Sequence, residues 1–230
     1  MDEKLHLDVG TKLEKCALKV LPELNQQSLD VICKELNSNV EIYRGVLNEN
    51  VIYCSGEWSG ERFKQDFLMT SVLAIREGRQ TELWPNLKKT SGDLIVDCIM
   101  DMVESAKTSM SPDEVVAKGL VPKVIDVAAA TEILHKCYPV KFPMRHKKSE
   151  FGLAQLLYEG DLIAVSQLSY SDFIDQMNEL AKLLKEILTY RELKIPDNCL
   201  LFLLDRILSK VAEDPECLEN NKEIEETSEN

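Results

Sequence analysis

Two consecutive helical patterns between residues 169 and 211 dominate the hydrophobic profile of the chain. In the first, apolar residues recur at spacings of three and four with charged residues between them, which is typical of an amphipathic helix. Ser169 can cap the start of this helix, and Pro196 marks the start of the second, because proline lacks the amide hydrogen needed inside a helix. The apolar positions of the first helix are Phe173, Met177, Leu180, Leu184, Ile187 and Leu188.

The second helix is apolar on every side, because residues 200–204 are all large and apolar. Such a helix must be buried nearly all round, since each large side chain left in water costs about 1.5–3 kcal/mol. The pattern predicts either the centre of the chain's own core or a surface shared with a partner. The residues that would form such a shared surface are Met177, Leu184, Leu188, Leu200, Leu204 and Leu208.

Shorter helical patterns occupy most of the remaining chain, at residues 5–20, 28–36, 61–77, 93–106, 112–118, 124–135 and 149–158. Residues 40–54 combine β-branched and aromatic residues with a polar centre, and they fit either a hairpin or a helix. The sequence therefore predicts an all-α protein, a multi-helix bundle or irregular helical solenoid of about eight or nine helices. A small hairpin near residues 40–54 is the open alternative.

Prolines and charges divide the chain into regions. Two prolines, at 139 and 143, interrupt the helical pattern and lead into the basic run of Arg145, His146, Lys147 and Lys148. We predict an N-terminal helical region at 1–138, a hinge at 139–148, and a C-terminal helical region at 149–212 that packs on the first as one folded unit. Residues 213–230 hold eight acidic residues and one lysine, which predicts a disordered acidic tail.

The overall composition is that of an acidic globular protein. The chain has 230 residues, a formal net charge of −13 and 44% hydrophobic residues. The shortage of Lys and Arg argues against general nucleic-acid binding. The basic run at 145–148 fits either a solvated linker or a contact with an acidic partner. No apolar run approaches the roughly 20 residues that cross a bilayer, so no membrane insertion is expected.

The cysteines and histidines give little sign of chemistry. Seven cysteines are scattered along the chain without the paired spacing of a zinc site. Scattered free thiols indicate a reducing compartment, so we expect a cytoplasmic or nuclear protein. His135 and Cys137 are two positions apart, which on a helix points them to different faces. The motifs of phosphate-binding loops, serine hydrolases and zinc proteases are missing, and we expect neither a cofactor nor a catalytic site.

Ser111 stands at the start of a predicted helix. Pro112 follows it and Glu114 lies three positions on, which is the pattern of a capping box. The same Ser-Pro pair is a candidate phosphorylation site, and a phosphate at a helix N-terminus would be electrostatically compatible with the cap.

These features match best a non-enzymatic helical adaptor, or a subunit of a larger intracellular assembly, that acts through protein–protein contacts. The expected partner is another protein, and a homo-oligomer is also compatible with the pattern. Two alternatives stay open. One is an enzyme whose site is assembled from distant residues, and the other is a helical carrier of an apolar ligand.

Overall fold

The computed structural model describes residues 3–21, 25–77 and 83–215, and the side chains of residues 8–21, 25–76 and 85–215. This part of the chain contains thirteen α-helices and two π-helical segments but no strand, so the all-α prediction is confirmed. The helices outnumber the predicted eight or nine mainly because residues 60–77 form several short pieces, with Val72 in an extended conformation. The elements are α1 (Glu3–Val20), α2 (Gln26–Val46), η1 (Asn50–Cys54), α3 (Gly60–Arg62), η2 (Phe63–Leu68), α4 (Met69–Ser71), α5 (Leu73–Glu77), α6 (Leu83–Lys89), α7 (Gly92–Ser105), α8 (Pro112–Gly119), α9 (Val127–Cys137), α10 (Lys147–Leu157), α11 (Leu162–Ser166), α12 (Tyr170–Tyr190) and α13 (Asp197–Glu213).

Residues 40–54 contain two helical segments with a short break at 47–48 and no strand, so the alternative hairpin is wrong. Helix α2 continues to Val46, past the polar residues 37–39, and the π-helical segment η1 follows it. The helix continues because the face that packs on the core extends through this stretch, where Leu36 and Tyr43 are both buried. The ring of Tyr43 packs edge-on against Phe67 with the ring centroids 4.9 Å apart. Polar residues on the outer face of a helix do not end it when the inner face still has a core to cover.

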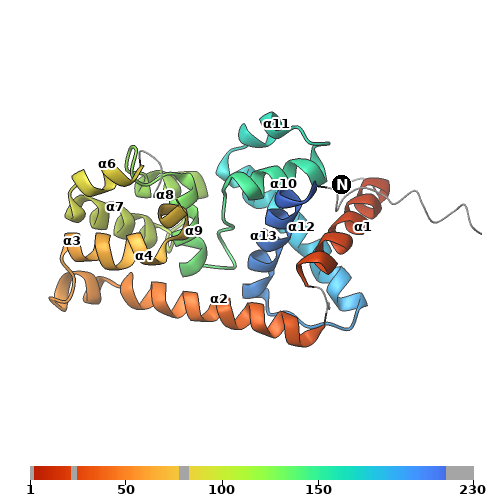
Figure 1. Ribbon diagram of the computed structural model, residues 1–230, viewed down its shortest axis with the longest axis horizontal. Coiled ribbons are helices and arrows are strands. Elements are labelled where there is room, and N and C mark those ends of the chain that lie inside the picture. The colour runs from red at the N-terminus through yellow and green to blue at the C-terminus, as the bar shows by residue number, and fades with distance from the viewer. Residues whose placement is uncertain (1–2, 22–24, 78–82, 216–230) are drawn as a thin grey trace, which may run out of the picture.

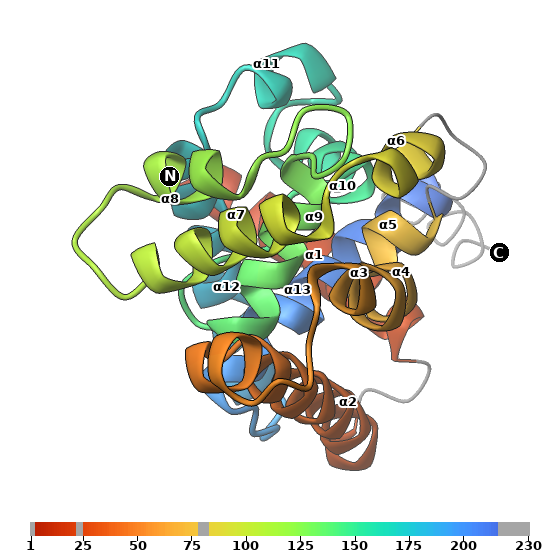
Figure 2. The same cartoon turned by 90° about the vertical axis from the view of Figure 1, so that its left-hand side faces the viewer.

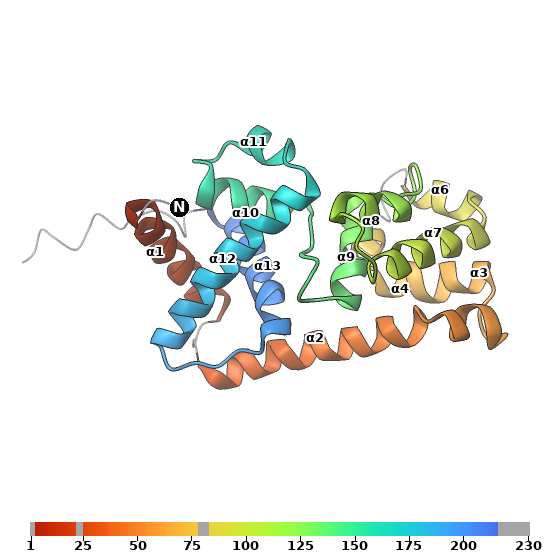
Figure 3. The ribbon, with the colours of Figure 1, turned by 180° about the vertical axis from the view of Figure 1, so that it is seen from behind.

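The helices form two groups that are joined by the long helix α2 (Figures 1 and 3). Helices α3 to α9 form the first group, and α1 and α10 to α13 form the second. Helix α2 packs against α9 in the first group and against α13 in the second. The non-helical segment between α9 and α10 contains the two prolines of the predicted hinge. Helix α1 packs on α10, α12 and α13, so the two groups do not follow the order of the chain.

Helix α13 is the centre of the second group. It packs against α1, α2, α10 and α12, and its apolar residues are buried on all sides, as its sequence requires. Helix α10 crosses it very closely at Gly152. A Cβ atom at this position would lie 2.5 Å from the carbonyl oxygen of Leu208. Only glycine leaves room for the two backbones at this crossing.

Helix α9 is the centre of the first group, with α2, α5, α7 and α8 packed around it (Figure 2). Its buried Glu132 accepts hydrogen bonds from the amides of Leu73 and Ala74 at the start of α5, both at 2.8 Å. The same carboxylate pairs with Lys136 at 2.5 Å, and the Lys136 ammonium lies 4.8 Å from the centre of the Tyr43 ring. These buried charges all have partners, and they tie α2 and α5 to α9.

Candidate functional site

A groove of about 580 Å³ lies where the two groups of helices meet, and we call it the junction groove. One wall is α8 and the start of α9. The other wall is the start of α10 and the connection from α11 to α12. Its apolar lining is Val116, Ala117, Leu120, Val127, Ala128 and Leu168, and its charged or titratable lining is Asp113, Asp126, Arg145, His146, Lys147 and Glu150. Leu120 and Val127 are 37% and 38% exposed, so apolar surface is open to solvent here.

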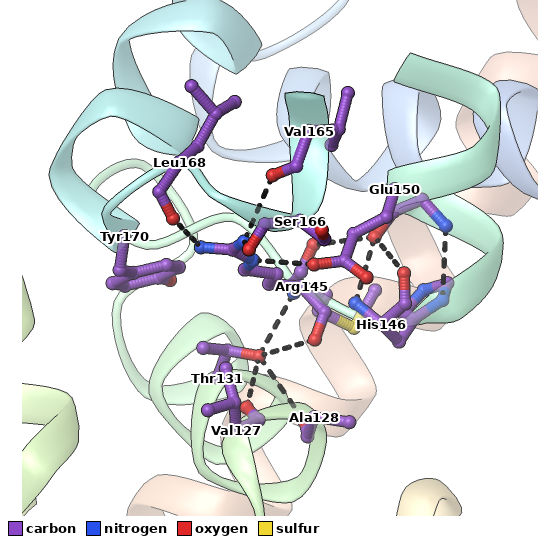
Figure 4. Close-up of polar contacts among 12 residues, drawn as sticks. Val127, Ala128, Thr131, Arg145, His146, Glu150, Val165, Ser166, Leu168 and Tyr170 are labelled. Carbon is purple, nitrogen blue, oxygen red and sulfur yellow. Dashed lines mark hydrogen bonds and ion pairs between the residues drawn. The ribbon is translucent and has the colours of Figure 1, made fainter. Parts of the chain in front are cut away.

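Arg145 is the structural centre of the second wall (Figure 4). Its guanidinium donates to the carbonyl oxygens of Leu168 at 2.8 Å and Val165 at 3.2 Å, and to the carboxylate of Glu150 at 2.8 Å. Its backbone amide donates to Thr131 Oγ1 on α9 at 2.9 Å. Only 10% of the side chain is exposed. Arg145 therefore holds α9, α10 and the end of α11 together, and its charge is used within the fold.

His146 is the N-cap of α10 and also points inward. Its Nδ1 accepts a hydrogen bond from the Ser149 amide at 3.3 Å, and its Nε2 lies 3.0 Å from Asp205 on α13. Burial acts to lower the pKa of His146, but the hydrogen bond and the charge of Asp205 outweigh it and raise this pKa above its ordinary value. His146 thus links the start of α10 to α13.

The other two residues of the basic run face solvent. Lys148 pairs with Glu213 at 2.9 Å, so the first residue of the predicted acidic tail does meet the basic run. Residues 216–230 of that tail lie outside the described part of the chain. Lys147 lines the junction groove and has no partner among the described residues. The basic run is therefore not one surface: two residues support the fold, one is paired, and Lys147 alone offers charge to the groove.

The carboxylates of the groove are also engaged. Asp113 on α8 accepts from the amides of Tyr170 at 2.6 Å and Ser171 at 3.0 Å, which caps α12 from another helix. Burial acts to raise the pKa of Asp113, but these hydrogen bonds and one from the Ser171 hydroxyl lower it overall. Asp126 caps α9 through the amide of Ala129 at 2.9 Å. With Glu150 bound to Arg145, each of these carboxylates has a partner in the fold.

Ser111 forms the predicted capping box. Its Oγ accepts from the Glu114 amide at 3.3 Å, and the Glu114 carboxylate accepts from the Ser111 amide at 3.0 Å. The hydrogen bonds from Ser111 lower the pKa of Glu114. The cap is confirmed. Ser111 is exposed, and its phosphorylation stays a prediction.

The six positions expected for a shared apolar surface lie inside the molecule. The most exposed of them is Leu200 at 8%, and the others are more deeply buried between α12, α13 and their neighbours. The structure therefore places them in the core of the second group. Partner contact through Met177, Leu184, Leu188, Leu200, Leu204 or Leu208 would require these helices to separate, and it stays an untested prediction.

His135 and Cys137, which are two positions apart in the sequence, are buried too. His135 is fully buried, with Nδ1 2.8 Å from the carbonyl oxygen of Phe142. Burial lowers the pKa of His135 and raises the pKa of Cys137 to about 12, so the thiol is not a nucleophile at neutral pH. Within the described ranges, no three metal-binding side chains gather in one place. Nor is any described helix both long and apolar enough to cross a bilayer.

No protein-family model, curated protein sequence or solved structure matches this chain. Its class is that of an all-α protein built from two groups of helices around a shared groove. The sequence did not predict that groove, because its two walls are far apart in the chain. A local signal existed only for single residues, such as Asp126, which is a residue type that often caps a helix but lies inside the predicted helix 124–135 and directly before the observed α9.

Proposed function

We propose that this protein is a non-enzymatic helical adaptor, or a subunit of a larger intracellular assembly, that binds a segment of a partner protein in the junction groove. The observation that supports this proposal is the combination of open apolar side chains with charged groups that already have partners in the fold. Leu120 and Val127 offer apolar surface, as the centre of a protein interface does.

The chemistry of the groove favours binding over catalysis. The pKa values of Asp113 and His146 are both displaced, which can indicate an active site. In each case, however, the pKa is displaced by hydrogen bonds that hold two helices together. A general acid or base needs to exchange its proton with a substrate, whereas these two groups are held by helix caps and by Asp205.

The six cysteines in the described residues are free thiols. Free thiols are typical of proteins in a reducing compartment, and they support a cytoplasmic or nuclear location for the proposed adaptor.

Site-specific photocrosslinking in the cells that make the protein tests the proposal. Benzoylphenylalanine at position 127, in the groove, should give a protein adduct. The same probe at the exposed position Val31 of α2 is the matched control. The adduct should also be lost when Leu120→Asp is introduced beside the probe. Equal adducts from both positions, or none from position 127, would contradict a groove that binds a partner.

A further inference from the structure

We infer that the contact between α9 and α13 is an acid-sensitive joint, which loosens when His135 takes up a proton below a pH of about 6.5. This inference goes beyond the proposed function and does not depend on it. It follows from the place of His135 between the two groups of helices, and from a buried ring nitrogen that has no hydrogen-bond partner among the described residues.

One face of α9 meets the second group of helices. Thr131 and His135 are four positions apart on α9, so they lie on the same face of the helix. Thr131 Oγ1 accepts a hydrogen bond from the backbone amide of Arg145 at 2.9 Å. The ring of His135 stacks on Phe202 of α13, with the ring centroids 6.0 Å apart. We call these contacts, together with the bond from His135 to Phe142, the α9–α13 joint.

The geometry of the joint decides where the ring of His135 carries its hydrogen. Nδ1 lies 2.8 Å from the carbonyl oxygen of Phe142. A carbonyl oxygen only accepts, so Nδ1 carries the hydrogen of the neutral ring and Nε2 has none. Nε2 is buried and has no hydrogen-bond partner in the described part of the chain. A proton added to Nε2 would therefore create a buried cation without an acceptor, which is unfavourable while the joint is closed.

Burial and charge oppose each other at His135. Burial lowers the pKa of His135 most strongly, and the charge of Lys136 lowers it further. The hydrogen bond to Phe142 and the charges of Asp205 and Glu132 act to raise the same pKa. Burial outweighs them, so the closed joint holds His135 in its neutral form.

The two carboxylates attract a proton, but neither bonds to Nε2 of His135. Asp205 pairs with His146 at 3.0 Å, and Glu132 pairs with Lys136 at 2.5 Å. The cations of two adjoining segments are bound to carbonyl oxygens, Arg44 of α2 to Cys137 and Lys141 of the connection to Ala106. Protonation of His135 therefore requires that the ring leave its closed position.

The pH dependence has a definite sign and size. The pKa of His135 is lowered in the closed joint, so its contribution is complete above the ordinary value of about 6.5 and is lost as the pH falls below that value. Once α9 separates from α13, the ring meets water and binds a proton with ordinary affinity. The open fraction should therefore rise about tenfold between pH 7.5 and pH 5.5. His146 and Asp205 lie together in the second group, so their pair stays closed during this opening.

Amide hydrogen exchange followed by NMR on the full chain tests the inference. Rates at pH 7.5 and pH 5.5 are corrected for the intrinsic effect of pH on exchange. The Arg145 amide, which bonds to Thr131, reports on the joint, and its protection should fall about tenfold. The amide of the buried Leu184 on α12 reports on unfolding of the second group. Its protection should fall much less, because that unfolding also breaks the His146–Asp205 pair, which acid strengthens.

Two variants assign the effect. His135→Asn places an amide nitrogen near the Phe142 carbonyl but cannot be protonated, so the fall at Arg145 should shrink to less than about twofold. The matched control is His146→Gln, which removes the neighbouring histidine and should keep the fall of about tenfold. If His135→Asn does not fold, the ring nitrogen signals of the wild type decide. At pH 5.5 the closed protein should still show His135 as the neutral ring with its hydrogen on Nδ1.

The outcomes separate a joint from general acid unfolding. A fall at Arg145 that exceeds the fall at Leu184 and disappears in His135→Asn supports the inference. An equal fall at both amides overturns it, because acid would then unfold the second group as a whole. Unchanged protection at Arg145 together with a protonated His135 ring also overturns it, since the closed joint would then tolerate the charge.

Discussion

Replacing Gly152 by alanine should destabilise the protein, even though alanine favours a helix by about 1 kcal/mol over glycine. Helix α10 crosses α13 at this residue, and the new Cβ would lie 2.5 Å from the Leu208 carbonyl oxygen and 2.7 Å from its Cα. Carbon atoms in contact lie about 3.5–4 Å apart, so the helices would have to separate by about 1 Å. Because the clash is with backbone, no side-chain rotation can relieve it.

The magnitude follows from two opposing effects. Overpacking a well-filled core costs about 1–3 kcal/mol, and the contact with the backbone of Leu208 places Gly152→Ala near the upper end of that range. The gain in helix propensity recovers about 1 kcal/mol of that loss. We expect a net decrease of about 2 kcal/mol in the free energy of unfolding. Urea unfolding followed by the helical circular dichroism signal measures it.

Gly45→Ala on α2 is the matched control. Apart from the adjacent residues and backbone of α2 itself, no atom lies within 4 Å of the position where its Cβ would be. This substitution should raise the free energy of unfolding by about 0.5–1 kcal/mol, because only the helix propensity changes. If Gly152→Ala were as stable as Gly45→Ala, the close crossing of α10 and α13 would be wrong, and so would the central position of α13.

Three further predictions concern the residues around the junction groove. Arg145→Met should lower the free energy of unfolding by about 3 kcal/mol, because it leaves Glu150 and three carbonyl groups without their donor; chemical denaturation measures this, and a loss below about 0.5 kcal/mol would make Arg145 a surface residue. Asp205→Asn should destabilise the protein more at pH 5.5 than at pH 8.5. The pKa of His146 is raised in the folded state. The stability that the His146–Asp205 pair contributes is therefore fully present below the ordinary histidine pKa of about 6.5, and it is lost as the pH rises through the raised pKa. A His146→Gln background should remove this pH dependence, and its persistence there would assign it to another group. Ser111→Ala should cost about 1 kcal/mol and Ser111→Asp much less, since aspartate also caps a helix; thermal unfolding of both variants compares them, and equal losses would exclude the cap as the cause.

The helices that could be predicted from the sequence are those whose apolar face stays the same along their length. Helix α12 buries residues at spacings of three and four from Tyr170 to Leu188, and α13 is buried on all sides. Local periodicity alone defines both. The prediction failed at α2, where the polar residues 37–39 resemble a helix end. The sequence around residues 37–39 does not show that the helix continues through them, because it continues by packing on helices that are distant in the chain.

The junction groove could not be predicted because each of its polar residues is explained only by a partner far along the chain. From the sequence, Asp113 is an acidic residue in the first turn of α8, which would stabilise that helix. In the structure it caps α12, which begins 57 residues later. His146 reads as part of a basic run, yet its ring bonds to Asp205. Charged side chains that are neighbours in the sequence point in different directions in the folded chain, so a run of basic residues does not predict a basic surface. Of the four residues of the basic run, Lys147 alone lies exposed at the groove without a partner among the described residues, and only the folded structure shows this.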